Sequence, residues 1–195
     1  MGKIFYVMGK SSSGKDTIYN RLVVDRELGL NRIVGYTTRP MREGEINGKE
    51  YFFTNEQELK QLEDRGKVVE KRTYKTIYGD WNYFTVDDGN LDIINKNYIL
   101  IGTLESYRSV REYFGKDRIV PIYINVEDGI RLMRAVSREM QQKNPGYEEL
   151  CRWFLADSKD FSDDVLKDLE INTKYENDDL ERCYLQIKEV IKKSL

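Results

Sequence analysis

The sequence predicts an α/β fold in which a parallel sheet is flanked by helices and carries a small inserted α+β subdomain. Short apolar runs alternate with segments of helical periodicity toward both ends of the chain, which is typical of strand–helix units. A loop bounded by two glycines follows the first apolar run and leads into a helical segment. The stretch from 38 to 88 differs from the rest, because it is polar, aromatic and punctuated by glycine.

The composition limits the class of protein. A chain of 195 residues fits one compact domain with an insertion. Its 32 basic and 34 acidic residues nearly cancel, so the net charge gives no reason to expect a nucleic acid or a membrane surface as a partner. The chain has no histidine, which excludes Ser-His-Asp and Cys-His catalysis and histidine-ligated metals. Cys151 and Cys183 both fall in helical patterns, so we expect no disulfide framework and a cytoplasmic location.

The first half contains two strands, one helix and the insertion. The first apolar run is too short for a signal peptide or a membrane span, and it suits a buried strand. The predicted elements are the strand 3–8, the helix 16–28 that ends at Gly29, and the strand 31–38. In the insertion we expect strand-like pieces at 50–54 and 67–74, with a helix between them over 54–66 that starts with a capping box from Thr54 to Gln57.

The second half returns to alternating strands and helices. We expect strands at 97–103 and 118–126, a helix over 104–115 between them, and a short strand near 169–173. The apolar face of the next helix contains Ile130, Met133, Val136 and Met140. After a polar break at 141–146, two more helices present Tyr147, Leu150, Phe154 and Phe161, and then Leu180, Tyr184, Ile187 and Ile191.

The glycine loop nearly matches a phosphate-binding motif. Residues 9–17 read GKSSSGKDT, against the pattern G-x-x-x-x-G-K-[ST], and they stand between a strand and a helix as that motif requires. Backbone N–H groups of such a loop and the helix N-terminus bind phosphate oxygens, and the lysine reaches the terminal phosphates. We therefore expect an ATP site formed by Gly9, Ser11, Ser12, Ser13, Gly14, Lys15, Asp16 and Thr17.

Asp16 stands where the motif has the hydroxyl that ligates magnesium, and Thr17 comes one residue late. A carboxylate is a good Mg²⁺ ligand, but it is also a negative charge beside a triphosphate. Asp16 therefore either binds the metal directly or weakens the site, and we favour the first interpretation.

A second motif is more specific. Residues 36–53 read YTTRPMREGEINGKEYFF, which resembles the monophosphate-binding segment of guanylate kinases. The resemblance covers the whole chain. It implies a P-loop sheet made of residues 1–37 and 89–195, a monophosphate-binding insertion at 38–88, and a helical lid at about 134–152.

The resemblance assigns the acceptor site. Arginines at the places of Arg39 and Arg42 hold the phosphate of the acceptor, and two arginines can make charge-assisted, forked contacts to one phosphate. Glu45 is placed to hold these arginines. A glutamate at the place of Glu70 accepts hydrogen bonds from guanine, which offers adjacent N–H donors. The remaining acceptor residues on this resemblance are Tyr51, Tyr78 and Asp80.

The lid and the adenine side are assigned in the same way. The segment 132–154 resembles the family's lid, where arginines close over the triphosphate and stabilise the charge on the transferring phosphoryl group. The matching arginines are Arg134, Arg138 and Arg152, which join Lys15 as the expected catalytic residues. Asn172 matches an asparagine near the adenine of ATP.

The chain also departs from the family pattern. Where the family has Asp-x-Asp at the end of a strand, this chain has Ile101 and Thr103. The hydroxyl of the family's Y-G-T is replaced by Asp80, and Gly35 stands where a serine commonly contacts the acceptor base. These changes leave the identity of the acceptor open.

The sequence therefore favours an ATP- and Mg²⁺-dependent nucleoside monophosphate kinase, with GMP or dGMP as the acceptor. Two alternatives remain: a kinase for a different monophosphate, and a catalytically silent module of the same fold that binds a nucleotide or a phosphopeptide. We expect small-molecule nucleotides as partners, with no nucleic acid and no membrane, and a homodimer stays open.

Overall fold

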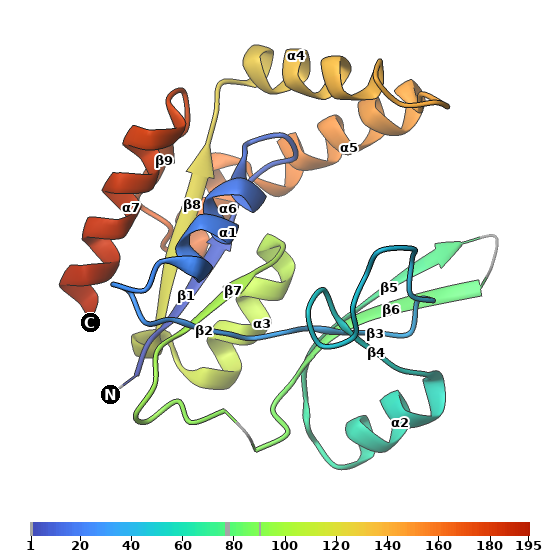
Figure 1. Cartoon of the computed structure of the whole chain (residues 1–195), viewed down its shortest axis with the longest axis vertical. Helices are drawn as coiled ribbons and strands as arrows, with labels where there is room; N and C mark the ends of the chain where they lie inside the picture. Colours follow the sequence, from blue (N-terminus) through green and yellow to red (C-terminus); the bar gives the residue numbers. More distant parts are fainter. Residues whose placement is uncertain (1, 77–78, 90) are drawn as a thin grey trace.

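The computed structural model describes residues 2–76, 79–89 and 91–195. Its core is a five-stranded sheet in the order β2-β7-β1-β8-β9, in which every pair of neighbours is parallel. Helices cover both faces of this sheet, and a second, four-stranded sheet lies to one side (Figure 1). The predicted α/β class is confirmed.

The elements of the core alternate along the chain. Its strands are β1 (Ile4–Met8), β2 (Asn31–Arg32), β7 (Tyr98–Ile101), β8 (Ile119–Asn125) and β9 (Lys174–Glu176). Its helices are α1 (Lys15–Val24), α3 (Leu104–Phe114), α4 (Asp128–Glu139), α5 (Tyr147–Asp160), α6 (Asp163–Asp168) and α7 (Leu180–Ser194), with a 3₁₀ turn, η1, at Lys116–Arg118. None of the helices in the described part of the chain is both long and apolar enough to span a membrane.

The central strand β1 is buried along its whole length. Ile4 pairs with Tyr98 of β7 on one side and with Ile119 of β8 on the other. Residues 5, 7 and 99 face α1 and α7, whereas residues 4, 6 and 8 face α3 and the end of α5. A strand with both faces covered must be apolar at every position, which explains the unbroken run IFYVM.

The insertion has its own small sheet and core. It consists of β3 (Tyr36–Thr37), β4 (Phe52–Phe53), α2 (Glu56–Asp64), β5 (Val68–Thr76) and β6 (Gly79–Val86), with the strand order β4-β3-β6-β5. Leu59, Phe84 and Val86 form its buried cluster. Thr37 and Phe84 are almost fully buried, so the insertion has a packed interior of its own.

Three local predictions were wrong. The expected strand 31–38 is two strands in different sheets, because Arg32 pairs with Ile99 of the core and Tyr36 pairs with Phe84 of the insertion. Helix α2 is capped by Asn55, whose side chain accepts the N–H of Glu58, and not by a Thr54–Gln57 box.

The last core strand is 174–176 and not 169–173. The residues before it are needed to end α6, where the N–H of Ile171 bonds to the C=O of Leu166. Strand β9 then pairs with the end of β8, so that its last residue lies beside Asn125.

The packing of α7 against the sheet gives a stability prediction. Ile187 is fully buried against the sheet, whereas Leu185 on the same helix is 50% exposed. We expect Ile187→Ala to lower the free energy of unfolding by about 2–5 kcal/mol, since it leaves a cavity, and Leu185→Ala to change it by less than about 0.5 kcal/mol. Urea unfolding of the two variants measures both, and equal losses would contradict the packing described.

Candidate active site

The glycine loop lies between β1 and α1, at the carboxyl edge of the sheet (Figure 1). Gly14 caps α1 with a left-handed backbone (φ 81°), and a Cβ on it would lie 2.4 Å from Nδ2 of Asn177. A Cβ on Gly9 would lie 2.5 Å from the carbonyl oxygen of Ile124. Both glycines of the motif are therefore required by close approach of the chain to β8 and to the segment after β9.

The loop has polar atoms that lack partners. Ser13 is fully buried, and among the described residues neither its Oγ nor that of Ser12 has a hydrogen-bond partner. These hydroxyls lie just before the N-terminus of α1, where unpaired N–H groups and the helix dipole favour an anion. The arrangement can bind a phosphate group.

Lys15 and Asp16 begin α1. The Nζ of Lys15 lies 3.3 Å from Oδ2 of Asp16, and the Asp16 side chain is 75% exposed. Thr17 is also exposed. Both oxygen-bearing side chains are thus accessible beside the loop, and the Asp16 carboxylate lies within ion-pair distance of the lysine of the motif.

An asparagine that the sequence did not single out holds the loop. Asn177 follows β9, is almost fully buried, and donates from Nδ2 to the carbonyl oxygen of Ser13 over 2.7 Å. Asn172, the residue predicted for the adenine side, is exposed and precedes β9. Because residues after parallel strands gather at one edge, the position of Asn177 after a strand was the available signal.

Helices α4 and α5 extend beyond the end of β8 and border the loop (Figure 1). Between them and the loop lies a cavity of about 620 Å³, whose lining includes Ser11, Ser12, Arg131, Arg138 and Phe154. A space of this kind beside a phosphate loop is large enough for a nucleotide.

Arg131 joins these helices to the loop. Its side chain is 1% exposed, and it pairs with Asp128 (2.8 Å) and with Asp157 of α5 (3.3 Å). Its Nη1 donates to the carbonyl oxygen of Ser11, whose N–H donates to Asp157 over 2.7 Å. Both peptide groups that flank Ser11 are therefore tied to the ion pair of Arg131 and Asp157.

The predicted lid arginines lie in different surroundings. Arg134 donates to the backbone oxygen of Asn177 over 3.1 Å, and Arg138 lines the large cavity. Arg152 is 66% exposed and pairs with Glu149, three residues earlier on α5. The structure thus brings Arg134 and Arg138 to the loop side and leaves Arg152 in a local surface pair.

The apolar face predicted for α4 was wrong at two of its four positions, since Ile130 and Val136 are half-buried. Met133 and Met140 are 64% and 67% exposed, whereas Arg131 and Ala135 are buried. The reason is that α4 packs on α5 and the loop through its Arg131 side and does not lie flat on the sheet.

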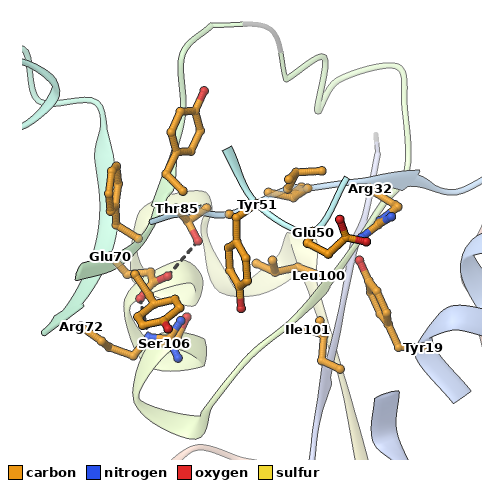
Figure 2. Close-up of a pocket in the computed structure, with 16 residues that line it drawn as sticks. Tyr19, Arg32, Glu50, Tyr51, Glu70, Arg72, Thr85, Leu100, Ile101 and Ser106 are labelled. Carbon is orange, nitrogen blue, oxygen red and sulfur yellow. Dashed lines mark hydrogen bonds and ion pairs between the residues drawn. The ribbon is translucent and has the colours of Figure 1, made fainter. Parts of the chain in front are cut away.

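A second cavity, of about 90 Å³, lies between the core and the insertion. Figure 2 shows Glu70 and Arg72 on one side of it and Tyr19, Arg32 and Glu50 on the other. Ile101, from the end of β7, also lines this cavity. The cavity therefore borders the carboxyl edge of the core sheet. The glycine loop lies at the same edge, so a ligand in this cavity would lie near a phosphate bound by the loop.

Glu70 is the buried carboxylate of this cavity. It is 7% exposed, its Oε1 accepts the Thr85 hydroxyl over 2.8 Å (dashed in Figure 2), and its Oε2 accepts from Nε of Arg72 over 3.2 Å. A carboxylate with two partners still has acceptor capacity for a ligand N–H.

The strand pairing corrects the expected neighbours of Glu70. In the β5–β6 hairpin Glu70 lies opposite Thr85 and Arg72 opposite Tyr83, while Asp80 lies opposite Lys75 near the exposed turn. Asp80 is therefore not part of the cavity lining, and Tyr78 lies outside the described residues. The hydroxyl that lies beside Glu70 is that of Thr85, which the sequence analysis did not name.

Glu45 binds the side chain of Arg39 and the backbone of Arg42, the two arginines expected at the acceptor phosphate. Arg39 is 3% exposed and makes two hydrogen bonds to the Glu45 carboxylate, of 2.8 and 2.7 Å. The same carboxylate accepts the backbone N–H of Arg42 over 2.7 Å. The Arg39 guanidinium also lies 5.6 Å from the Tyr51 ring, so the predicted residues form one cluster.

The strand end without carboxylates has a different use. Thr103 caps α3, and its side chain accepts the N–H of Ser106. The hydroxyl of Tyr6 donates to the backbone oxygen of Thr103 over 3.0 Å and would be 2.1 Å from a Cβ on Gly102. Burial raises the pKa of Tyr6, so this group stays a neutral donor. The turn from β7 into α3 is thus built around a tyrosine.

Glu45 gives a pH prediction. Arg39, and then the backbone N–H of Arg42, lower the pKa of Glu45 to about 2. A carboxyl group whose pKa is depressed by folding stabilises the protein above its unfolded pKa, and this contribution is lost as the pH falls toward 2. We expect Glu45→Gln to be less stable than the wild type at pH 6, with a difference that shrinks toward pH 2.

Urea unfolding across this pH range measures the difference, with Glu43→Gln as the control at an exposed neighbour. A gap for Glu45→Gln that stayed constant from pH 6 to pH 2 would show that the Arg39–Glu45 pairing does not lower the pKa.

Comparisons with known proteins agree on one family. The family model described as guanylate kinase matches residues 1–194. The guanylate kinase of Porphyromonas gingivalis is 30% identical over 193 residues, covering 98% of this chain and 97% of that protein. That of Mycoplasmoides gallisepticum is 29% identical over 194 residues, covering 98% and 93%. The solved structure of guanylate kinase from Anaplasma phagocytophilum has the same fold, with a TM-score of 0.63 over 99% of this chain and 86% of that chain at 21% identity. With its phosphate loop and its buried Glu70 in place, the chain belongs to the guanylate kinase family of nucleoside monophosphate kinases.

Proposed function

We propose that the protein transfers the terminal phosphoryl group of ATP to GMP or dGMP. The observation that carries this proposal is the buried Glu70 carboxylate beside the Thr85 hydroxyl, in a cavity at the same sheet edge as the phosphate loop. Guanine presents adjacent N–H donors, which a carboxylate can accept. The family supports a monophosphate kinase, and Glu70 supports guanine as the base.

The residues divide the work between two substrates. The loop N–H groups and Lys15 bind the donor phosphates, and Arg39, Arg42 and Tyr51 hold the phosphate of the acceptor. Tyr78 is proposed for the same phosphate. No general base is required, because the attacking oxygen belongs to an ionised phosphate, so positioning and charge stabilisation supply the catalysis.

The lid completes the donor site in this proposal. Arg134 and Arg138 stabilise the charge that develops on the transferring group, and closure of α4 and α5 excludes water. Arg152 acts there only if it leaves its pair with Glu149. Asn172 is proposed for the adenine, with Asn177 holding the loop below it.

Magnesium fits the donor site through Asp16. No group of three or more His, Cys, Asp or Glu side chains that could hold a metal occurs in the described residues. Mg²⁺ bound with a nucleotide needs none, because it takes one or two protein oxygens together with phosphate oxygens and water. The exposed Asp16 carboxylate beside the loop meets this need. When bound, the metal neutralises phosphate charge.

The cellular setting is also a proposal. Cys151 is a free, exposed thiol and Cys183 a free, buried one. Free thiols suit a reducing compartment, which supports the cytoplasm. The substrates are small nucleotides.

The two alternative functions differ in which acceptor is phosphorylated and in whether ADP is formed at all. A kinase for another monophosphate would phosphorylate that acceptor at least as well as GMP. A silent module would bind ATP without producing ADP. Gly35 and the missing Asp-x-Asp motivate the first, whereas the retention of Lys15 and the Arg39–Glu45 cluster disfavours the second.

The central test measures ADP formation from ATP and Mg²⁺ with GMP, dGMP, AMP, CMP, UMP and dTMP in parallel. We expect turnover with GMP and dGMP to exceed that with the others. Lys15→Ala should lower kcat by about 10²–10³-fold without loss of fold, because one charge-stabilising donor is removed. Lys60→Ala, at an exposed site on α2, is the matched control. Unchanged turnover in Lys15→Ala would refute the kinase proposal.

Asp16 has its own test. If its carboxylate binds Mg²⁺, Asp16→Ala should need more Mg²⁺ for half-maximal activity, by about tenfold or more, and Asp16→Ser should recover part of the loss through its hydroxyl. Titration of MgCl₂ at fixed ATP measures this. Higher activity of Asp16→Ala at every Mg²⁺ concentration would mean that the carboxylate weakens the site instead.

A further inference from the structure

Arg72 lines the smaller cavity beside Glu70, and the proposed phosphoryl transfer does not yet assign it a function. The two residues are two apart on β5 and therefore project from the same face of the strand. The Arg72 side chain is 20% exposed, and it lines the cavity together with Glu70 and Ser106 (Figure 2). A guanidinium is thus a built-in part of the wall that surrounds the acceptor.

Most donors of this guanidinium are unused. Its Nε donates to Oε2 of Glu70 over 3.2 Å. In the part of the chain that the structure describes, neither Nη atom makes a hydrogen bond or an ion pair. Arginine carries five N–H donors, so the donors on both Nη atoms of Arg72 remain available to a bound ligand. The cavity therefore suits a ligand that brings an acceptor to Arg72.

The rest of the cavity defines what that ligand must offer. Glu70 accepts, Arg72 donates, and the β7 end contributes the apolar side chain of Ile101 where a carboxylate was expected. Thr103 is used to cap α3. The base therefore meets one carboxylate and one guanidinium side by side, a pair that matches an N–H next to a C=O.

We propose that Arg72 is a second specificity-determining residue, and that the Glu70–Arg72 pair reads the N1–H and C6=O edge of a 6-oxopurine. The proposal rests on the proposed function and names the substrate class more closely. Glu70 accepts the N–H, and the free Nη donors of Arg72 bind the carbonyl oxygen, as arginine does with guanine in nucleic acids. Adenine presents the opposite order of donor and acceptor on this edge, so the pair rejects it.

Recognition by Glu70 and Arg72 also makes the choice of acceptor depend less on the 2-amino group of guanine. The edge that Glu70 and Arg72 read is identical in GMP and IMP. We therefore expect IMP to be an acceptor, with a kcat/KM closer to that of GMP than the kcat/KM of AMP is.

The experiment uses the whole 195-residue chain, ATP and four acceptors: GMP, IMP, AMP and 6-thio-GMP. The thio analogue keeps N1–H and replaces the carbonyl oxygen with sulfur, a weak acceptor. In the wild type we expect GMP to exceed 6-thio-GMP in kcat/KM. Arg72→Met should lower kcat/KM for GMP by about 10–100-fold, mainly through KM, and should remove the preference for GMP over 6-thio-GMP.

Two controls keep the result specific. Lys71→Met changes the neighbouring residue on β5, whose side chain pairs with Glu63 outside the cavity. It should leave both the kcat/KM for GMP and the preference for GMP over 6-thio-GMP unchanged. Arg72→Lys keeps the charge but loses the fork, so it should fall between the wild type and Arg72→Met. Thermal melting and ATP binding of each variant report whether it is folded.

The outcomes separate the two proposals. If the wild type uses GMP but Arg72→Met or Arg72→Lys, once folded, keeps the full preference for GMP over 6-thio-GMP, Arg72 does not read the base. A loss of GMP turnover with that preference intact would mean that Arg72 only positions Glu70. A wild type that strongly prefers CMP, AMP, UMP or dTMP, or that phosphorylates nothing, overturns the proposed function itself.

Discussion

The site depends on one constraint, the burial of β1 in parallel register between β7 and β8. Because the three strands run the same way, the glycine loop after β1, the turn into α3 after β7 and helix α4 after β8 all begin at one edge (Figure 1). Donor and acceptor must meet for an in-line transfer, and parallel pairing supplies that proximity before any side chain contributes. Phosphoryl transfer then requires only that the side chains and backbone N–H groups that bind the phosphates are correctly placed along this edge.

The loop is held from two sides. Asn177 binds the Ser13 carbonyl from the β9 side, and the Arg131–Asp157 pair binds both peptide groups of Ser11 from the side of α4 and α5. A buried ion pair contributes little net stability, since desolvation offsets its attraction, but removing one partner leaves a buried charge. We therefore interpret the Arg131–Asp157 pair as a group that positions the loop and not as a source of net stability. Because Arg131 belongs to α4 and Asp157 to α5, the shape of the loop depends on where these two helices lie.

The sequence allowed the prediction of features that depend on local pattern. The apolar run of β1, the loop that follows it and the clamp of Glu45 on Arg39 are all set within a few residues, and the structure contains them. Features that depend on distant pairing escaped. The strand 31–38 changes sheets at residues 33–35, where Gly35 is the only local mark of a break, and a single glycine does not show which sheet the following residues will join.

Two residues that line the cavities were missed for the same reason. Thr85 lies beside Glu70 because of the register of the β5–β6 hairpin. The match to the Y-G-T motif had instead indicated Asp80 as the neighbour of Glu70. Arg131 looks like a surface charge on an amphipathic helix, and only its approach to Asp157, 26 residues away, makes it a buried group. Single-residue patterns cannot show a partner that the fold brings from elsewhere.

The distribution of charge explains how a site without strand-end carboxylates stays balanced. A nucleoside monophosphate has an anionic end and a neutral base, so it needs net positive charge at only one end. Arg39 and Arg42 share one carboxylate, Glu45, which leaves an excess of positive charge where the phosphate is expected. At the other end the positive charge of Arg72 offsets the negative charge of Glu70, so a base bound there would meet directional hydrogen bonds with little net field. Further carboxylates there would repel the acceptor phosphate as it enters, because buried charges are weakly screened. Their replacement by Ile101 and by the cap Thr103 is therefore consistent with selective recognition of the base.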